Sequence, residues 1–137
     1  PNLPEAGVML GERAPENLRE MRRAAERLRE RMTHAGSRWV VLKGGHLSHG
    51  DAVDLATDGD RMIELALPRV DTKNTHGTGC TLSAAIAALL PQSPDAPVAI
   101  RRAKDYLAGA LAAADRLDVG HGHGPVHHFH ALWREPR

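Results

Sequence analysis

The feature that most constrains how this chain can fold is a glycine-rich stretch at residues 71–81, which reads DTKNTHGTGCT. An apolar, β-rich run precedes it, and an alanine- and leucine-rich run at residues 81–90 is typical of a helix. Gly77 and Gly79 permit backbone angles that a side chain would forbid. A small-residue turn that leads into a helix presents unpaired N–H groups at the positive end of the helix dipole, which attracts anions. We therefore predict a phosphate-binding site here, with Cys80 at its rim.

Length and composition exclude several classes of function. The chain has 137 residues, enough for one domain with a modest core. A net charge of +1 and an aromatic content of 3% argue against a nucleic acid partner or an anionic membrane surface. No apolar run approaches the roughly 20 residues of a membrane helix. The single cysteine allows no internal disulfide and favours a reducing, cytoplasmic setting.

Two helices are predicted near the start of the chain. Pro4 suits the first turn of a short helix that ends near Gly11, and Glu5 lies where the helix dipole favours a carboxylate. Taken alone, Glu5 is explained by that dipole. A longer helix is predicted from Pro15 to about His34, with Arg and Glu interleaved on its solvated faces. Its apolar stripe consists of Leu18, Met21, Ala25, Leu28 and Met32, and Gly36 marks its end.

The strongest strand signal is the run at residues 38–43. Its apolar centre is continuous, as in a strand covered on both faces, and it ends at Lys43, which two glycines follow. Ligands bind at the carboxyl ends of strands in open α/β sheets, so Lys43 is a candidate for a phosphate contact. The alternative is a strand-end lysine that extends into solvent.

A hairpin is predicted next, with strands at residues 52–56 and 61–70 joined by a turn at Asp58-Gly59. Asp51 and Asp54 are interpreted as turn and edge-strand residues rather than as a catalytic pair.

The last predicted helix covers residues 98–117. Lys104 lies on this helix and could point back toward the glycine-rich stretch. The alternative is a solvated lysine, and the spacing alone favours that alternative. The glycine- and histidine-rich tail at residues 120–130 is interpreted as a closing loop rather than a metal site. The buried side of the helix is predicted to contain Ile100, Leu107, Leu111 and Ala114.

Three interpretations of Cys80 remain open from the residues alone. The first is a nucleophile, with His76 and Asn74 as nearby partners in the sequence. The second is a proton acceptor beside a bound phosphate, and the third is a small buried apolar residue. A helix N-terminus favours the thiolate in the first two. The strand-turn-helix context favours phosphoryl transfer, although the stretch is not a Walker A loop, because no Lys-Ser or Lys-Thr pair follows its second glycine.

The stretch at residues 71–80 resembles the anion-hole motif of the ribokinase-like kinases. Most of that superfamily has an aspartate as base at the last position; cysteine there is similar to the hydroxymethylpyrimidine/phosphomethylpyrimidine kinases of thiamine biosynthesis. Residues 1–6, 43–46 and 122–128 are also similar to that family, so the resemblance covers essentially the whole chain.

The resemblance implies roles for particular residues. It implies that the anion hole and its base are Gly77, Thr78, Gly79 and Cys80. It implies that ATP contacts are made by Asn2, Lys43, Thr78 and Lys104, and that Mg²⁺ is held with the help of Glu5. The implied reaction moves the γ-phosphoryl group of ATP to the hydroxymethyl group of the pyrimidine and then to the resulting monophosphate.

The implied fold is α/β and ribokinase-like, with helices on both faces of a mostly parallel sheet and a hairpin at one edge. Because the family has a further N-terminal half, residues 1–137 are expected to be the C-terminal, ATP- and anion-binding part of one such domain. Two alternatives stay open: a pyridoxal-type kinase, and a non-catalytic nucleotide-binding fragment. The expected partner is a small pyrimidine, and a truncated sheet edge allows a homodimer.

Overall fold

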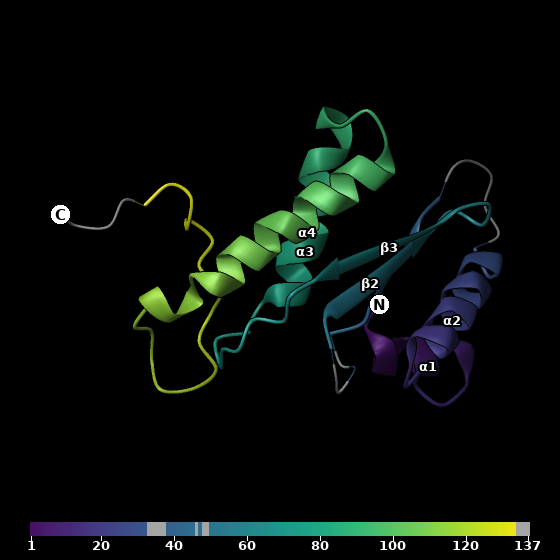
Figure 1. The fold of residues 1–137 in the computed structure, drawn as a ribbon, viewed down its shortest axis with the longest axis horizontal. Helices are drawn as coiled ribbons and strands as arrows, with labels where there is room; N and C mark the ends of the chain where they lie inside the picture. Colours follow the sequence, from purple (N-terminus) through teal and green to yellow (C-terminus); the bar gives the residue numbers. More distant parts are fainter. Residues whose placement is uncertain (33–37, 46, 48–49, 134–137) are drawn as a thin grey trace. The chain divides into compact units, whose positions relative to one another are not determined.

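The structure is a computed structural model, and it describes residues 1–32, 38–45, 47 and 50–133. It divides into two compact units, Pro1–Arg69 and Val70–Arg137, which are described separately (Figure 1). The predicted helix end at His34 and Gly36, and the histidine of the 43–46 motif, lie outside the described residues.

Two capped helices open the first unit. Helix α1 (Leu3–Leu10) begins after Asn2 and ends at Gly11, whose φ of 71° is left-handed, so the predicted bounds are confirmed. Helix α2 (Leu18–Glu30) begins later than the predicted Pro15. The reason is that the Asn17 side chain accepts the backbone N–H of Glu20 and thereby caps the first turn.

The sheet of the first unit has three strands in the order β1-β2-β3: β1 (Val40–Lys43), β2 (Ala52–Thr57) and β3 (Met62–Leu67). Both strand pairs are antiparallel, which differs from the mostly parallel sheet expected. The reason is local: a parallel crossover needs a dozen or more connecting residues, and the connections here are far shorter. The predicted hairpin turn at Asp58 is confirmed, and the hairpin makes up most of this sheet.

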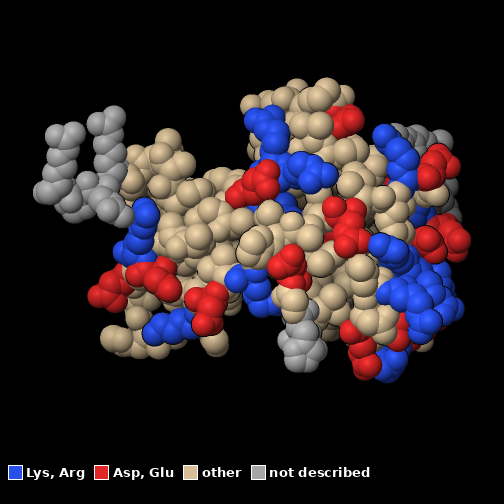
Figure 2. Space-filling model, viewed as in Figure 1, with Lys and Arg blue, Asp and Glu red and all other residues tan. Residues whose placement is uncertain are grey.

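Helices α1 and α2 cover one face of this sheet and form the core of the unit (Figure 1). The buried cluster consists of Leu3, Ala6, Leu10, Met21, Ala24, Ala25, Leu28, Val40, Leu42 and Leu55. Charges of both signs lie together on the outer side of α2 (Figure 2), where Arg22 pairs with Glu64 and Arg27 pairs with Glu12. The prediction of a solvated, mixed-charge face is thereby confirmed.

Two sequence predictions about the strands need correction. Strand β1 alternates between buried and half-buried residues, because α1 and α2 cover only one face of the sheet. Asp54 is not an edge-strand residue, because it lies on the central strand β2, is buried and accepts the backbone N–H of Gly44 at 2.9 Å.

The second unit is built on two helices packed side by side, α3 (Thr78–Leu89) and α4 (Ala96–Ala112), with short 3₁₀ turns η1 (Leu90–Gln92) and η2 (Ala114–Arg116) (Figure 1). Helix α3 starts three residues before the predicted position, so Gly79 and Cys80 belong to its first turn. Helix α4 ends before the predicted residue 117, because the chain tightens into η2. Among the described residues, no helix has both the length and the apolar character needed to cross a bilayer.

Candidate phosphate-binding site

The N-terminus of α3 is built to leave backbone donors unpaired. Gly77 occupies the cap position with φ 84° and ψ 2°, a conformation that favours glycine, and its carbonyl accepts the N–H of Thr81 at 2.8 Å. Among the described residues, no side chain caps α3, whereas Asn2, Asn17 and Asp95 cap α1, α2 and α4. Within the described residues, no acceptor faces the N–H groups of Gly79 and Cys80. These two donors, at the positive end of the helix dipole, are suited to hold an anion.

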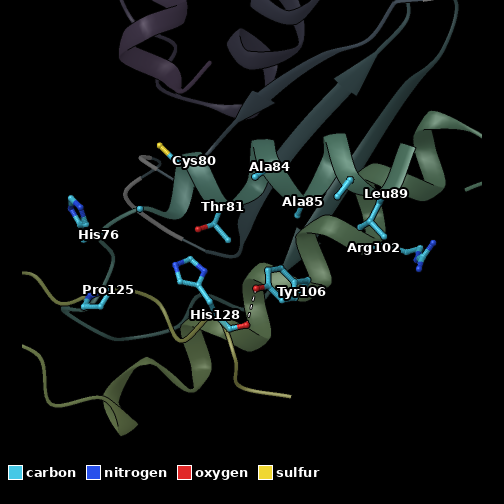
Figure 3. A pocket seen from close by; sticks show the side chains of 12 residues that line it. His76, Cys80, Thr81, Ala84, Ala85, Leu89, Arg102, Tyr106, Pro125 and His128 are labelled. Carbon is cyan, nitrogen blue, oxygen red and sulfur yellow. Dashed lines mark hydrogen bonds between the residues drawn. The ribbon is translucent and has the colours of Figure 1, made fainter. Parts of the chain in front are cut away.

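Cys80 is exposed at this helix end. In Figure 3 its sulfur projects from a different side of α3 than the Thr81 side chain does. The interpretation of Cys80 as a small buried apolar residue is therefore wrong. An exposed thiol in the first turn of a helix, beside free backbone donors, is placed to act on a group next to a bound phosphate.

A groove of about 940 Å³ runs along α3 from this end (Figure 3). Alanines of α3 line much of it, and polar groups lie at its ends and along one side, so it offers an apolar surface with a few anchoring points. Tyr106 of α4 closes one side, where its hydroxyl donates to the carbonyl of His128 at 2.8 Å. The lining residues are His76, Gly77, Cys80, Thr81, Ala84, Ala85, Ala88, Leu89, Arg102, Tyr106, Pro125 and His128.

A Cys-His-Asn nucleophile arrangement is not formed. His76 lines the same groove as Cys80, but no hydrogen bond joins a histidine to Cys80 among the described residues. The side chain of Asn74 is buried and bonded to Asp115 and Gly124, so it does not orient His76. Activation of the thiol by a hydrogen-bonded histidine is therefore not supplied by the described residues.

The remaining predicted ligand-binding residues of the first unit lie close together. Asn2 and Glu5 form a capping box: the Asn2 amide oxygen accepts the N–H of Glu5 at 2.8 Å, and the Glu5 carboxylate accepts the N–H of Asn2 at 2.7 Å. Lys43, at the end of β1, donates its backbone N–H to the carbonyl of Pro1 at 2.9 Å, which makes a parallel bridge beside Asn2. The fold therefore brings Asn2, Glu5 and Lys43 to one place.

This group fits what a magnesium phosphate complex requires. Mg²⁺ is commonly held by one or two carboxylates together with substrate phosphates and waters. Glu5 is an exposed carboxylate, and Lys43 is a nearby cation that can balance phosphate charge. The capping box also gives Glu5 a structural task, as the helix-dipole interpretation predicted.

Lys104 is placed differently from what spacing alone suggested. It is only 6% exposed on α4, so the solvated alternative is wrong. Of two other acidic residues with defined positions, Asp54 was assigned to an edge strand and Asp115 was missed. Asp54 is buried opposite Lys43 in the sheet, and Asp115 on η2 binds Thr72 and Asn74. No local sequence pattern indicates the role of Asp115, because its hydrogen-bond partners lie about forty residues away in the sequence.

Comparisons with known proteins identify the family of this chain. The phosphomethylpyrimidine kinase family model matches residues 1–127. The chain is 48% identical over 135 residues to the hydroxymethylpyrimidine/phosphomethylpyrimidine kinase of Rhizobium meliloti, covering 98% of this chain and 49% of that protein. It is 45% identical over 133 residues to the enzyme of the same name from Escherichia coli, covering 97% of this chain and 48% of that protein. The chain thus spans about half the length of these relatives.

A solved structure shows the same fold. The ADP complex of Bacillus subtilis pyridoxal kinase superimposes with a TM-score of 0.85 at 32% identity, covering 98% of this chain and 48% of that one. The predicted α/β, ribokinase-like fold class is confirmed. Family model, sequence identity and fold together show that this chain belongs to the phosphomethylpyrimidine kinase family.

Proposed function

We propose that this chain carries the ATP- and anion-binding part of a kinase that phosphorylates hydroxymethylpyrimidine and then its monophosphate in thiamine biosynthesis. The observation that carries the proposal is the uncapped N-terminus of α3, with an exposed Cys80 in its first turn. The names of the relatives support the choice of pyrimidine. The single cysteine and the small-molecule chemistry favour a cytoplasmic enzyme. The homodimer stays a prediction.

In the proposed reaction, the bond between the γ-phosphorus of ATP and its bridging oxygen breaks as the acceptor oxygen bonds to that phosphorus. ADP leaves, and the proton of the acceptor hydroxyl passes to the thiolate of Cys80, which becomes the thiol. In the second reaction the acceptor is a phosphate oxygen of the monophosphate. Charge on the moving phosphoryl oxygens is stabilised by the N–H groups of Gly79 and Cys80. Gly77 and Thr78 shape the turn that aims these donors.

The remaining residues hold ATP in this proposal. Lys43 contacts the phosphates as a point charge, Asn2 fixes their position, and buried Lys104 presents a cation on the nucleotide side. Glu5 helps to hold Mg²⁺. When bound, Mg²⁺ neutralises phosphate charge.

A pyridoxal-type kinase is the closest alternative, because the structure also superimposes on a pyridoxal kinase. The two proposals differ only in the acceptor. A further alternative is a nucleotide-binding module without catalysis. It is considered because this chain covers only about half the length of its relatives. It predicts ATP binding with no turnover.

The test replaces the matching segment of the Rhizobium meliloti kinase with residues 1–137. The hybrid enzyme receives ATP and Mg²⁺ with equimolar hydroxymethylpyrimidine and pyridoxal, and the phosphorylated products are separated by mass. We expect pyrimidine mono- and diphosphates in excess of pyridoxal phosphate.

Pyridoxal phosphate as the main product would favour the alternative acceptor. ATP binding by calorimetry, with no product from either acceptor in a folded hybrid, would favour the non-catalytic module. The unmodified Rhizobium enzyme, assayed beside the hybrid, is the reference for the pyrimidine products, and authentic pyridoxal phosphate calibrates the detection of the other product.

A further inference from the structure

A buried asparagine lies three residues before the turn that opens α3. Asn74 is 7% exposed, and both ends of its side-chain amide are bonded. Its Nδ2 donates to Oδ1 of Asp115 at 2.8 Å, and its Oδ1 accepts the backbone N–H of Gly124 at 3.1 Å. A buried amide with both ends paired fixes the segments that it joins.

Asp115 binds the same stretch a second time. Its Oδ1 accepts the hydroxyl of Thr72 at 2.6 Å, and Oγ1 of Thr72 in turn accepts the backbone N–H of Asn74 at 3.1 Å. One carboxylate oxygen on η2 therefore holds two residues of the approach to the phosphate site. We call Thr72, Asn74, Asp115 and Gly124 the Asn74 clamp.

Backbone bonds extend the clamp to the edge of the turn. His76 donates its N–H to the carbonyl of Gly124 at 3.0 Å, and Val126 donates to the carbonyl of His76 at 3.4 Å. These bonds end one residue before Gly77, whose left-handed conformation begins α3.

Gly124 belongs to the clamp because the Asn74 side chain leaves no room for a side chain at this position. A Cβ at this position would collide with Oδ1 and Cγ of Asn74. By contrast, a Cβ at Gly122 would meet no described atom within 4 Å. The tail can therefore approach the Asn74 side chain only at a residue without a Cβ.

We propose that the Asn74 clamp positions the phosphate site, a role that rests on the proposed function for its phosphate ligand. No side chain caps α3, so the direction of its free N–H groups depends on how the preceding turn is held. The clamp holds that turn from two other segments, η2 and the tail. Donors fixed before the ligand arrives stabilise charge without reorganising. Asp115 and Asn74 are thus positioning residues that touch no substrate.

The test compares Asp115→Ala with Asp115→Asn in the 137-residue chain. Asparagine keeps an oxygen that can accept both bonds, whereas alanine removes it. Amide exchange is followed by NMR at His76 and Thr81, whose bonds define the turn, with Ala103 in the middle of α4 as the internal reference. Inorganic phosphate is titrated while the amide signals of Gly79 and Cys80 are observed.

For Asp115→Ala we expect exchange at His76 and Thr81 to rise about 10-fold or more, with exchange at Ala103 unchanged, and phosphate affinity to fall about 10-fold. For Asp115→Asn we expect both quantities to stay within about 3-fold of the unsubstituted chain. Gly124→Ala should reproduce the alanine result, and Gly122→Ala should not.

Equal exchange at Thr81 in Asp115→Ala and the unsubstituted chain would overturn the proposal. So would a uniform rise that includes Ala103, because that reports global destabilisation rather than positioning. If the unsubstituted chain binds no phosphate while the exchange effect stays local, the clamp stands as a positioning device and the proposed function fails.

Discussion

At the scale of single residues, burial decides what each side chain can reach. Cys80 is exposed and Lys104 is buried, and neither fact follows from their spacing in the sequence. Spacing places a residue on a helix face, but only packing decides whether that face is covered. The motif at residues 71–81 predicted the left-handed turn at Gly77, because glycine preferences are local, but Gly79 was expected in the turn and lies in the first turn of α3 without a left-handed backbone.

The glycine pair after β1 offers a residue-scale prediction. A Cβ at Gly44 would collide with the backbone carbonyl of Val53 and with the Met21 side chain, whereas at Gly45 it would meet no described atom within 4 Å. We expect Gly44→Ala to lower the free energy of unfolding by about 2 kcal/mol or more, because a neighbouring strand cannot move aside without loss of pairing. Chemical denaturation measures this change in the free energy of unfolding.

Gly45→Ala is the matched control and should lie within about 0.5 kcal/mol of the unsubstituted chain. Equal stability of the two variants would contradict the described packing between β1, β2 and α2.

At the scale of elements, the caps decide where helices begin. In the described part of the chain, α1, α2 and α4 start at an Asn or Asp whose side chain accepts a backbone N–H, and α3 starts at Gly77 without one. Capping residues can be recognised in a sequence, yet α2 was expected at Pro15, two residues before its actual cap at Asn17.

The cap of α4 can be tested by Asp95→Ala. The Asp95 side chain accepts the N–H of Val98 at 2.9 Å. Its loss should cost about 1 kcal/mol of unfolding free energy. Asp105→Ala, at an exposed position within the same helix, serves as control and should be neutral or slightly stabilising, since alanine favours helix. Thermal unfolding of both variants checks this, and a larger loss for Asp105→Ala would contradict the assigned cap.

The hairpin turn gives a pH prediction. The pKa of Asp58 is lowered mainly by the backbone N–H of Arg61, with further help from the Arg61 side chain and the N–H of Asp60. A carboxyl whose pKa is depressed by folding stabilises the fold above its unfolded pKa of about 3.9, and that stability is lost as the pH falls through the folded pKa.

Asp58→Asn should therefore be less stable than the unsubstituted chain at pH 7, by about 1 kcal/mol, and the difference should vanish at low pH. Denaturation at a series of pH values measures this. The control is Asp60→Asn, whose side chain accepts no hydrogen bond among the described residues, and a pH-independent deficit for Asp58→Asn would refute the turn's electrostatics.

At the scale of the whole molecule, the class of fold and the β2–β3 hairpin were predictable, and the antiparallel pairing of β1 with β2 was not. The family resemblance implied helices and a mostly parallel sheet, yet the described strands are antiparallel because their connections are short. Residues far apart in sequence, such as Asn74 and Asp115, come together only through the packing of α3, α4 and the tail. Long-range contacts of this kind leave no mark in a local pattern.

Ligand binding should appear in the stability of the whole chain. If nucleotide binds the folded state alone, Mg²⁺-ADP at 100 times its dissociation constant should raise the free energy of unfolding by about 2.7 kcal/mol. Thermal unfolding with and without nucleotide measures this. The Cys80→Ala chain should show the same rise, because the thiol is assigned to the acceptor. No rise in either chain would contradict nucleotide binding by residues 1–137.

The central claim is that the exposed thiol at the start of α3 serves phosphoryl transfer, and one measurement tests it most directly. In the hybrid enzyme described above, the single-turnover rate of phosphoryl transfer from ATP to hydroxymethylpyrimidine is compared for Cys80, Cys80→Ala and Cys80→Asp. The account predicts a loss of about 10²- to 10⁴-fold for alanine and partial recovery with aspartate, which can also accept a proton. An alanine variant that keeps the full rate, with pyrimidine phosphate still its product, would contradict it.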